Sequence, residues 1–539
     1  MVLRPDCHYT VLAPNGYTGM NSGYARRIRE LQQRDCRNLF GGGLRGIERE
    51  CLRISDDGLI SLKPHPAALG SPLTHRFITT DYAESLLEFV TPPLASTWEV
   101  MQCLFDLHQF AVEHIDDEFL WPFSMPCGLT TEDAIPLAQY GSSNVGQMKT
   151  LYRRGLGERY GRFMQVISGL HLNYSLPEVF WSAYQEIEGD TASAEAFRSD
   201  AYMSMVRNVR RYDWLLLYLF GASPAVCKSF LQGRDAGLEE LDSSTMYGRY
   251  ATSLRMSGVG YQNSSQAALS VCANSLEEYV RDLSGAIETP SAEWDELGLE
   301  RDGERIQLNT NLLQIENEYY SSVRPKRVAE SGERPTRALE RGGVEYVELR
   351  VLDVSPFDPV GINQAEIRFI ETFLVYCMLQ ESPSINPEQQ KEHQSNHALV
   401  AGSGRKPGLE LMREGNPVSM QAWAQELLDD MKPVAEMLDC NLGEEYQQAL
   451  ATQLAVVNNV ELTPSARLLA DLKESGKSFV QYGLDIASNN RDYFRAQAKE
   501  HNVRRAELVA ESVQSVERQE AIESSDSLSF DAYITRYYS

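Results

Sequence analysis

Alternating apolar and polar positions predict several strands in the first two-thirds of the chain. The alternation is clearest over residues 46–54 and 344–353, and it recurs over residues 166–176 and at the end of an acidic stretch, residues 76–93. Residues 306–315 also have the pattern of a strand. Because successive side chains of a strand point to opposite faces of its sheet, each segment is expected to bury one face and keep the other polar.

Helical periodicity predicts the remaining elements. Apolar residues recur at spacings of three and four over residues 97–118, residues 149–160 form a short basic helical pattern, and the chain is mostly helical after residue 362. The sequence shows no internal repeat and no low-complexity segment. We therefore expect one α+β unit over residues 1–539, with a core at about 39–360 and a mostly helical part at about 361–539.

The charge and the cysteines narrow the class of protein. Acidic residues outnumber basic ones by 76 to 50, and the net charge of −26 repels nucleic acid and anionic membranes, so neither is expected as a partner. The nine cysteines are scattered without a Cys-x-x-Cys pair, which argues against a zinc ribbon and a dense disulfide framework. No signal peptide or membrane-spanning run is evident. We expect a cytoplasmic protein in a reducing compartment.

Two glutamates on one predicted strand raise the main chemical question. Glu48 and Glu50 would share a strand face at about 7 Å, where two carboxylates repel each other unless a cation lies between them. His171 lies on the polar face of its predicted strand. Further acids lie in or beside other strand-like segments, namely Asp81, Glu84, Glu88 and Glu348. Carboxylates joined by one imidazole suit Mg²⁺ or Mn²⁺ rather than zinc, so the pattern suggests such a site.

Each of these residues also has an ordinary structural interpretation. A single Asp or Glu is most often a surface residue, and Glu84 and Glu88, spaced by four, would also fit the solvated face of a helix. His171 alone would more often be a hydrogen-bonded structural histidine. The metal site therefore depends on whether the fold brings these residues together.

Three arginines offer groups for binding anions. Arg153, Arg255 and Arg350 each lie beside glycines, polar residues or carboxylates, where the fixed fork of a guanidinium holds a carboxylate or a phosphate. Singly, each is more often an exposed or ion-paired residue. The glycine run at residues 41–46 lacks the Gly-Lys-Ser/Thr ending of a phosphate-binding loop and precedes a strand, so it does not predict one.

Many ordered blocks of the chain carry a family resemblance. They include GIERE at 46–50, TTDYAE at 79–84, WPFSMPC at 121–127, SGLHLNYS at 168–175 and VELR at 347–350. These blocks resemble the proteobacterial glutamate–cysteine ligases, also called γ-glutamylcysteine synthetases. The resemblance implies that ATP, L-glutamate and L-cysteine give γ-glutamylcysteine, ADP and phosphate, the first step of glutathione biosynthesis. It also implies a glutamine-synthetase-like fold, in which a curved antiparallel sheet forms a funnel with helices outside.

The resemblance further implies roles for individual residues. The divalent ions would be held by Glu48, Glu50, Asp81, Glu88, His171 and Glu348. Arg153 and Arg350 would stabilise the transferred phosphoryl group, and Arg255 would bind a substrate α-carboxylate. Lys326 and Arg327 would help to hold the nucleotide. The cysteine pocket would consist of Tyr82, Leu156, Gln165, Tyr261 and Tyr320, with tyrosine at position 82 where family members also carry phenylalanine.

Two other interpretations stay open at this point. The chain could be another ATP-dependent carboxylate–amine ligase on the same scaffold, or a metal-binding protein without turnover. No segment after residue 362 resembles an ATP-grasp domain, so we do not expect a bifunctional enzyme that also adds glycine. We expect a monomer that is inhibited by glutathione.

Overall fold

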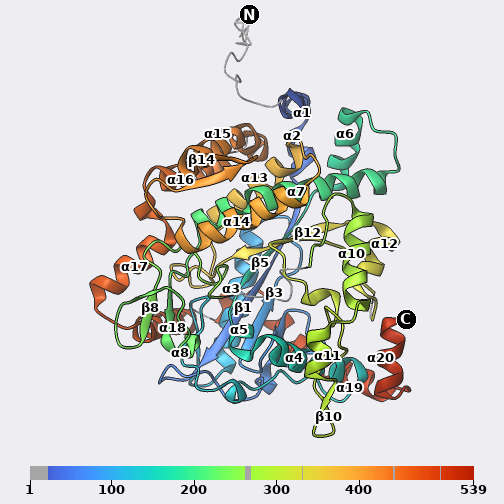
Figure 1. Ribbon diagram of the computed structural model, residues 1–539, viewed down its shortest axis with the longest axis vertical. Coiled ribbons are helices and arrows are strands. Elements are labelled where there is room, and N and C mark those ends of the chain that lie inside the picture. Colours follow the sequence, from blue (N-terminus) through green and yellow to red (C-terminus); the bar gives the residue numbers. More distant parts are fainter. Residues whose placement is uncertain (1–21, 261–268, 331, 441–442, 498) are drawn as a thin grey trace, which may run out of the picture.

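A central antiparallel sheet carries most of the segments predicted as strands (Figure 1). The computed structural model describes residues 22–260, 269–330, 332–440, 443–497 and 499–539. Within these ranges, no helix has both the length and the apolar character needed to span a bilayer. The sheet is open, and its strands run in the order β11-β12-β5-β1-β3-β2, with β4 also pairing with β1.

Four of the predicted strands are confirmed as members of this sheet. Its seven strands are β1 (Leu44–Ile54), β2 (Ile78–Thr80), β3 (Leu86–Val90), β4 (Phe119–Leu120), β5 (Leu170–Ser175), β11 (Val323–Lys326) and β12 (Tyr346–Leu352). Three small sheets lie apart from it, built by β6 (Ala225–Cys227), β7 (Glu239–Glu240) and β8 (Thr245–Tyr247), by β9 (Glu300–Arg301) and β10 (Glu304–Arg305), and by β13 (Glu410–Arg413) and β14 (Asn416–Ser419).

The prediction of a strand over residues 306–315 is wrong. This segment forms an irregular loop because its polar side chains bind the backbone in place of a neighbouring strand. The Gln307 amide donates to the carbonyls of Trp294 and Gly298, at 3.1 and 2.7 Å. The backbone N–H of Leu308 donates to Gln314 Oε1 at 3.0 Å. The basic segment that follows the loop forms β11 instead.

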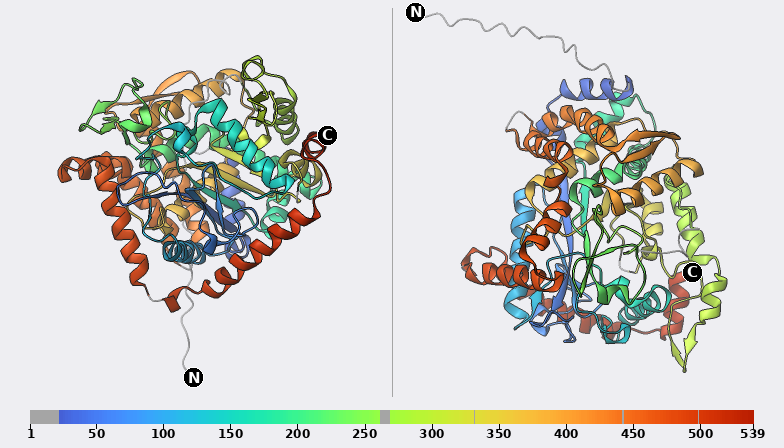
Figure 2. Two further views of the ribbon diagram at one scale, coloured as in Figure 1. Left: turned by 90° about the horizontal axis from the view of Figure 1, so that it is seen from below. Right: turned by 60° about the vertical axis from the view of Figure 1, so that its left-hand side comes forward.

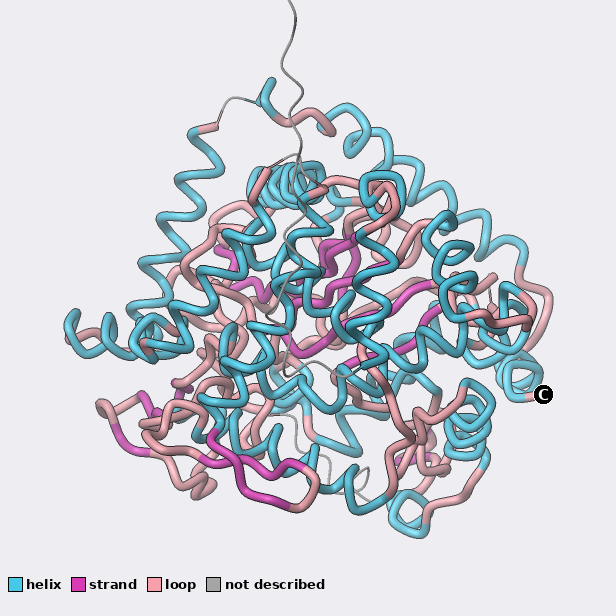
Figure 3. The backbone as a smooth tube through the Cα atoms, turned by 90° about the horizontal axis from the view of Figure 1, so that it is seen from above, coloured by secondary structure: helices cyan, strands magenta, loops and turns pink. Residues whose placement is uncertain are grey.

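Helices surround the sheet and make up most of the chain after residue 362, as the periodicity predicts (Figure 3). The first half contains α1 (Ser22–Gln32), α2 (Cys36–Phe40), α3 (Thr97–His114), α4 (Asn144–Tyr160), α5 (Arg162–Gln165), α6 (Glu178–Glu188), α7 (Ala194–Phe220) and α8 (Lys228–Leu231). The second half contains α10 (Leu276–Glu288), α11 (Ala292–Leu297), α12 (Pro335–Gly342), α13 (Gln364–Leu379), α14 (Pro387–Ser403), α15 (Met420–Asp439), α16 (Glu445–Asn458), α17 (Pro464–Ser475), α18 (Phe479–Ala496), α19 (Arg505–Ser525) and α20 (Phe530–Tyr538). The last helices run along the outside of the molecule, which is clearest in the left view of Figure 2.

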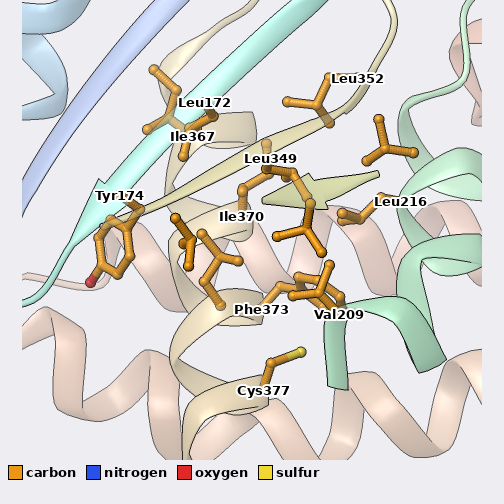
Figure 4. Close-up of a cluster of buried hydrophobic side chains, with 14 of the residues drawn as sticks. Leu172, Tyr174, Val209, Leu216, Leu349, Leu352, Ile367, Ile370, Phe373 and Cys377 are labelled. Carbon is orange, nitrogen blue, oxygen red and sulfur yellow. The ribbon is translucent and has the colours of Figure 1, made fainter. Parts of the chain in front are cut away.

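One face of the central sheet is packed with apolar side chains. Leu172 of β5 and Leu349 of β12 are fully buried and meet Ile370 and Phe373 of α13, with α7 closing the cluster (Figure 4). Burial of a side chain of this kind contributes about 1.5–3 kcal/mol, so this face fixes the curvature and position of the strands. Because neighbouring residues of a strand alternate, the opposite face is left for polar groups.

A disulfide joins two segments that are far apart in the sequence. Cys127 follows β4, Cys227 ends β6, and the bond closes a separation of 100 residues. This pairing could not be predicted from the spacing of the cysteines along the chain, because only the fold brings the two Cα atoms to 5.5 Å from each other. In a reducing compartment the same two residues would be neighbouring thiols.

Replacing both residues, Cys127→Ser with Cys227→Ser, is expected to lower the free energy of unfolding by about 3–5 kcal/mol under oxidising conditions, because the long loop is no longer closed in the unfolded chain. Urea denaturation with and without reductant measures this difference. In reductant the two proteins should unfold at similar urea concentrations. An equal loss in both conditions would show that the bond does not form in solution.

Candidate active site

The polar face of the sheet carries a group of carboxylates that line one cavity. β1 directs Glu48 and Glu50 to this face, while Cys51 points the other way into the apolar cluster. The strand register places Glu48 opposite His171 of β5 and Glu50 opposite Glu88 of β3. The cavity has a volume of about 390 Å³, and its floor is formed by the acids of β1 and β3, by His171 of β5 and by Glu348 of β12.

Three of the predicted metal ligands form a compact group. His171 Nδ1 lies 3.2 Å from Glu48 Oε2 and 3.9 Å from Glu348 Oε1, and one ligand atom from each residue falls within 4.8 Å of the others. Asn173 donates to Glu48 Oε1 at 2.8 Å and fixes that carboxylate. Glu50 Oε1 lies 3.7 Å from His171 Nε2. Two carboxylates and an imidazole at this spacing fit Mg²⁺ or Mn²⁺.

The protonation of these acids reflects their crowding. Burial raises the pKa of Asp81 to about 6, with a further contribution from the charge of Glu50. Burial also raises the pKa of Glu88 well above its usual value, and the negative charges of Glu48 and Asp81 add to the effect. Burial alone would raise the pKa of Glu348 as well, but nearby cations hold it well below its usual range. A divalent cation would relieve the repulsion among the acids.

Cationic side chains flank the acidic floor on two sides. On one side, α4 supplies Lys149 and Arg153, and the guanidinium of Arg153 stacks 4.6 Å from the ring centre of Tyr140. On the other side, β11 and β12 place three cations around Glu348. Their nearest nitrogens lie 2.9 Å (Arg350), 3.6 Å (Lys326) and 4.0 Å (Arg324) from its carboxylate oxygens. Acids between two cationic walls can bind a metal ion together with a polyanion.

Most residues predicted for the cysteine pocket line the same cavity. Tyr82, Leu156, Gln165 and Tyr320 all contribute to its wall, and Tyr261 lies outside the described residues. Gly157 on α4 makes room for Tyr82, because a Cβ atom at position 157 would collide with the tyrosine hydroxyl. The hydroxyl of Tyr82 therefore depends on a glycine in the neighbouring helix.

Two predicted residues do not line this cavity. Arg255 is buried behind the floor, where its guanidinium donates to the carbonyls of Arg350 and Leu352 at 3.0 and 3.2 Å. It lies 3.8 Å from Asp353, whose carboxylate accepts bonds from Ser223 and Ser253. Arg327 turns away from the cavity, because its guanidinium donates to the carbonyls of Gly342 and Gly343. The geometry gives its predicted contact with a nucleotide no support.

Several residues of the cavity were missed by the sequence interpretation. Lys149 and Arg324 are cations that the sequence did not identify as site residues. Lys149 precedes Arg153 by one helical turn, and Arg324 shares a strand face with Lys326. These spacings could have identified them. The remaining missed residues come from α4, α5 and the loop before β11, and they are Tyr152, Tyr160, Met164, Ile315, Asn317 and Glu318.

Comparisons with known proteins identify the family of the chain. The family described as glutamate–cysteine ligase matches residues 28–400. The chain is 49% identical over 497 residues to a glutamate–cysteine ligase of Pseudomonas putida, and the aligned residues cover 92% of this chain and 94% of that protein. It is 47% identical to that of Azotobacter vinelandii, over 96% of this chain and 98% of the relative.

Solved structures give the same result for the fold. The glutamate–cysteine ligase of Francisella tularensis in complex with AMP matches with a TM-score of 0.87 and 37% identity, over 93% of this chain and 98% of that one. A bifunctional glutathione synthetase from Pasteurella multocida matches with a TM-score of 0.72 and 25% identity, over 92% of this chain and 58% of that longer chain. The fold is thus that of an ATP-dependent ligase. Within that class, the chain belongs to the glutamate–cysteine ligase family.

Proposed function

We propose that this protein joins the γ-carboxylate of L-glutamate to the amine of L-cysteine with ATP, giving γ-glutamylcysteine, ADP and phosphate in the first step of glutathione biosynthesis. The observation that carries the proposal is the acidic floor with cations on both walls, in a chain of this family. The AMP bound to the Francisella tularensis relative supports a nucleotide as co-substrate.

The residues of the floor would hold Mg²⁺ or Mn²⁺ through Glu48, His171 and Glu348, with Glu50, Asp81 and Glu88 beside them. When bound, the metal would supply positive charge that offsets the charge of the ATP phosphates. The chain's own cations act at the same phosphates from opposite sides, Arg153 from α4 and Arg350 from β12. Lys326, at the same end of the cavity as Arg324, would contact the nucleotide.

The reaction proceeds in two steps. A γ-carboxylate oxygen of glutamate attacks the terminal phosphorus of ATP, and ADP leaves, which forms a γ-glutamyl phosphate. The deprotonated amine of cysteine then attacks the acyl carbon, and phosphate leaves. Arg153 and Arg350 would stabilise the negative charge on the phosphoryl oxygens in the first step and on the acyl oxygen in the second.

The two amino acids would be held by different parts of the site. Cysteine would lie against Tyr82, Leu156, Gln165 and Tyr320, with Tyr261 as a further contact by the family resemblance. By the family resemblance, Arg255 would bind the α-carboxylate of a substrate, for which its guanidinium would have to leave the carbonyls of Arg350 and Leu352. We propose that the whole chain acts as one catalytic unit.

The test is phosphate release by the purified protein with ATP, Mg²⁺, L-glutamate and L-cysteine, with each component omitted in turn. Release should require all four, and the reaction without cysteine is the control for plain hydrolysis of ATP. Phosphate release with a different amine or acid in a substrate panel would instead favour another ligase of this scaffold. Binding of Mn²⁺ without any release of phosphate would favour a metal-binding protein and would contradict the proposal.

The proposal extends to regulation and location. Glutathione contains the γ-glutamylcysteine unit of the product, so it should compete with the substrates for the same cavity. Inhibition that added glutamate does not relieve would argue against this competition. We also propose a monomer that works in the cytoplasm, where its thiol substrate stays reduced.

A further inference from the structure

The helix α20 packs against two walls of the active-site cavity. In Figure 1 it lies beside α4 at the lower right, and the two helices are in contact. Ile534 of α20 shares a small apolar cluster with Met148 and Leu151 of α4 and with Leu308. Leu308 belongs to the loop formed by residues 306–320, whose later residues line the cavity. The cluster therefore joins α4 and this loop from outside.

Tyr538 adds hydrogen bonds to this apolar contact. Its hydroxyl donates to the carbonyl of Gln314 and accepts from Asn309 Nδ2 at 2.8 Å. The Asn309 amide also donates to the Gln314 carbonyl at 3.0 Å, so three groups meet at one point of the loop. The hydroxyl of Tyr538 thus fixes the backbone at Gln314, whose own side chain is fully buried.

From Gln314 the contacts continue to the cavity wall. The backbone N–H of Gln314 donates to Glu318 Oε2 at 2.6 Å. Glu318 Oε1 accepts from Tyr160 Oη at 2.6 Å and from Arg159 Nη1 at 3.0 Å, and the ion-paired side chains of Arg159 and Glu318 are fully buried. Glu318 and Tyr160 both line the cavity, one from the loop and one from α4. A series of hydrogen bonds therefore runs from Tyr538 through Gln314 to Glu318 and Tyr160, which line the cavity.

We propose that Tyr538 is a positioning residue that sets the distance between α4 and the loop 306–320, and thereby shapes the pocket for the amine substrate. This inference rests on the proposed function. Leu156 of α4 and Tyr320 of the loop belong to that pocket, so a shift of either wall changes the fit of cysteine. The acidic floor belongs to β1, β3, β5 and β12, which are held by the apolar cluster on the opposite sheet face. Arg153 of α4, which would contact the ATP phosphates, is held separately by its hydrogen bond to the carbonyl of Asp81 and by the ring of Tyr140. The binding of ATP and of the metal should therefore be less affected.

The test variant is Tyr538→Phe, which removes one hydroxyl and keeps the ring in its apolar cluster. Loss of a hydrogen bond to the loop should raise the KM for cysteine about 5-fold, and kcat and the KM for ATP should stay within about 2-fold. The matched control is Tyr533→Phe, the same change on the same helix. Tyr533 is half-buried against the same cluster, and no side-chain hydrogen bond of Tyr533 is found within the described residues. Its kinetics should equal those of the wild type.

Hydrogen exchange supplies a readout that does not depend on turnover. Amides of residues 306–320 should exchange faster in Tyr538→Phe than in Tyr533→Phe. Equal exchange in the two variants, or an equal KM for cysteine, would overturn the positioning role, as would a parallel rise in the KM values for cysteine and ATP. If the wild type releases no phosphate with all four components, the proposed function fails, and the exchange comparison still decides whether Tyr538 holds the loop.

Discussion

The variant Glu348→Gln is expected to reduce kcat by more than about 100-fold while the protein stays folded. Groups that only orient a metal ligand already change metal affinity or activity by about 10–100-fold, and Glu348 would be a direct ligand. The amide keeps the shape of the side chain but removes the charge that faces Arg350, Lys326 and Arg324. Those cations would then oppose a divalent ion without a balancing carboxylate.

Phosphate release measures the loss of turnover, and direct titration with Mn²⁺ measures the loss of metal binding. The control is Glu345→Gln, an exposed acid three residues earlier in the chain, which should behave as the wild type. Thermal unfolding of both variants checks that the fold is intact. Turnover near the wild-type rate in Glu348→Gln would remove this residue from the metal site.

The second large effect is expected at Arg350. Burial disfavours its charge, but Glu348, Glu50 and Glu48 together raise its pKa, so it stays a cation at every pH of interest. Its Nη1 lies 2.9 Å from Glu348 and 3.4 Å from His171, at the centre of the floor. Arg350→Met should lower kcat by about 100–1000-fold, as expected when one group that stabilises developing charge is lost.

The variant Arg350→Lys tests whether the positive charge alone is enough for catalysis or whether the planar guanidinium is also needed. Lysine keeps the positive charge but cannot present the planar fork of donors, so kcat should recover only in part. The matched control is Arg337→Lys on the exposed face of α12, which should leave kcat and KM unchanged. If Arg350→Lys and Arg350→Met both keep the wild-type kcat, Arg350 takes no part in phosphoryl transfer.

Alternation along each strand was enough to predict the faces of the central sheet. It placed Glu48 and Glu50 together on one face of their strand, and both residues line the cavity. The pairing of strands could not be predicted in this way. That Glu48 lies opposite His171, more than a hundred residues later, depends on the register of β1 and β5.

The loop before β11 shows why the remaining errors arose. Its apolar residues suggested a strand, but the buried amide of Gln307 binds carbonyls in and just after α11, and that of Gln314 binds the backbone of its own loop. Which backbone groups such side chains reach depends on tertiary packing, which periodicity does not report. Glu318 and Tyr160 were absent from the predicted site because only the fold brings these two residues, 158 positions apart, within 2.6 Å of each other.

The contact between Gly157 and Tyr82 couples two positions that are 75 residues apart. Glycine within a helix lowers the stability of that helix by about 0.5–1 kcal/mol relative to alanine. Gly157 therefore makes α4 less stable, but it leaves room for the hydroxyl of Tyr82 in the cavity wall. With phenylalanine at position 82 that hydroxyl is absent, and the clash it makes with an alanine at position 157 disappears. The two positions should therefore vary together among relatives. Stabilising α4 by Gly157→Ala would first require Tyr82→Phe.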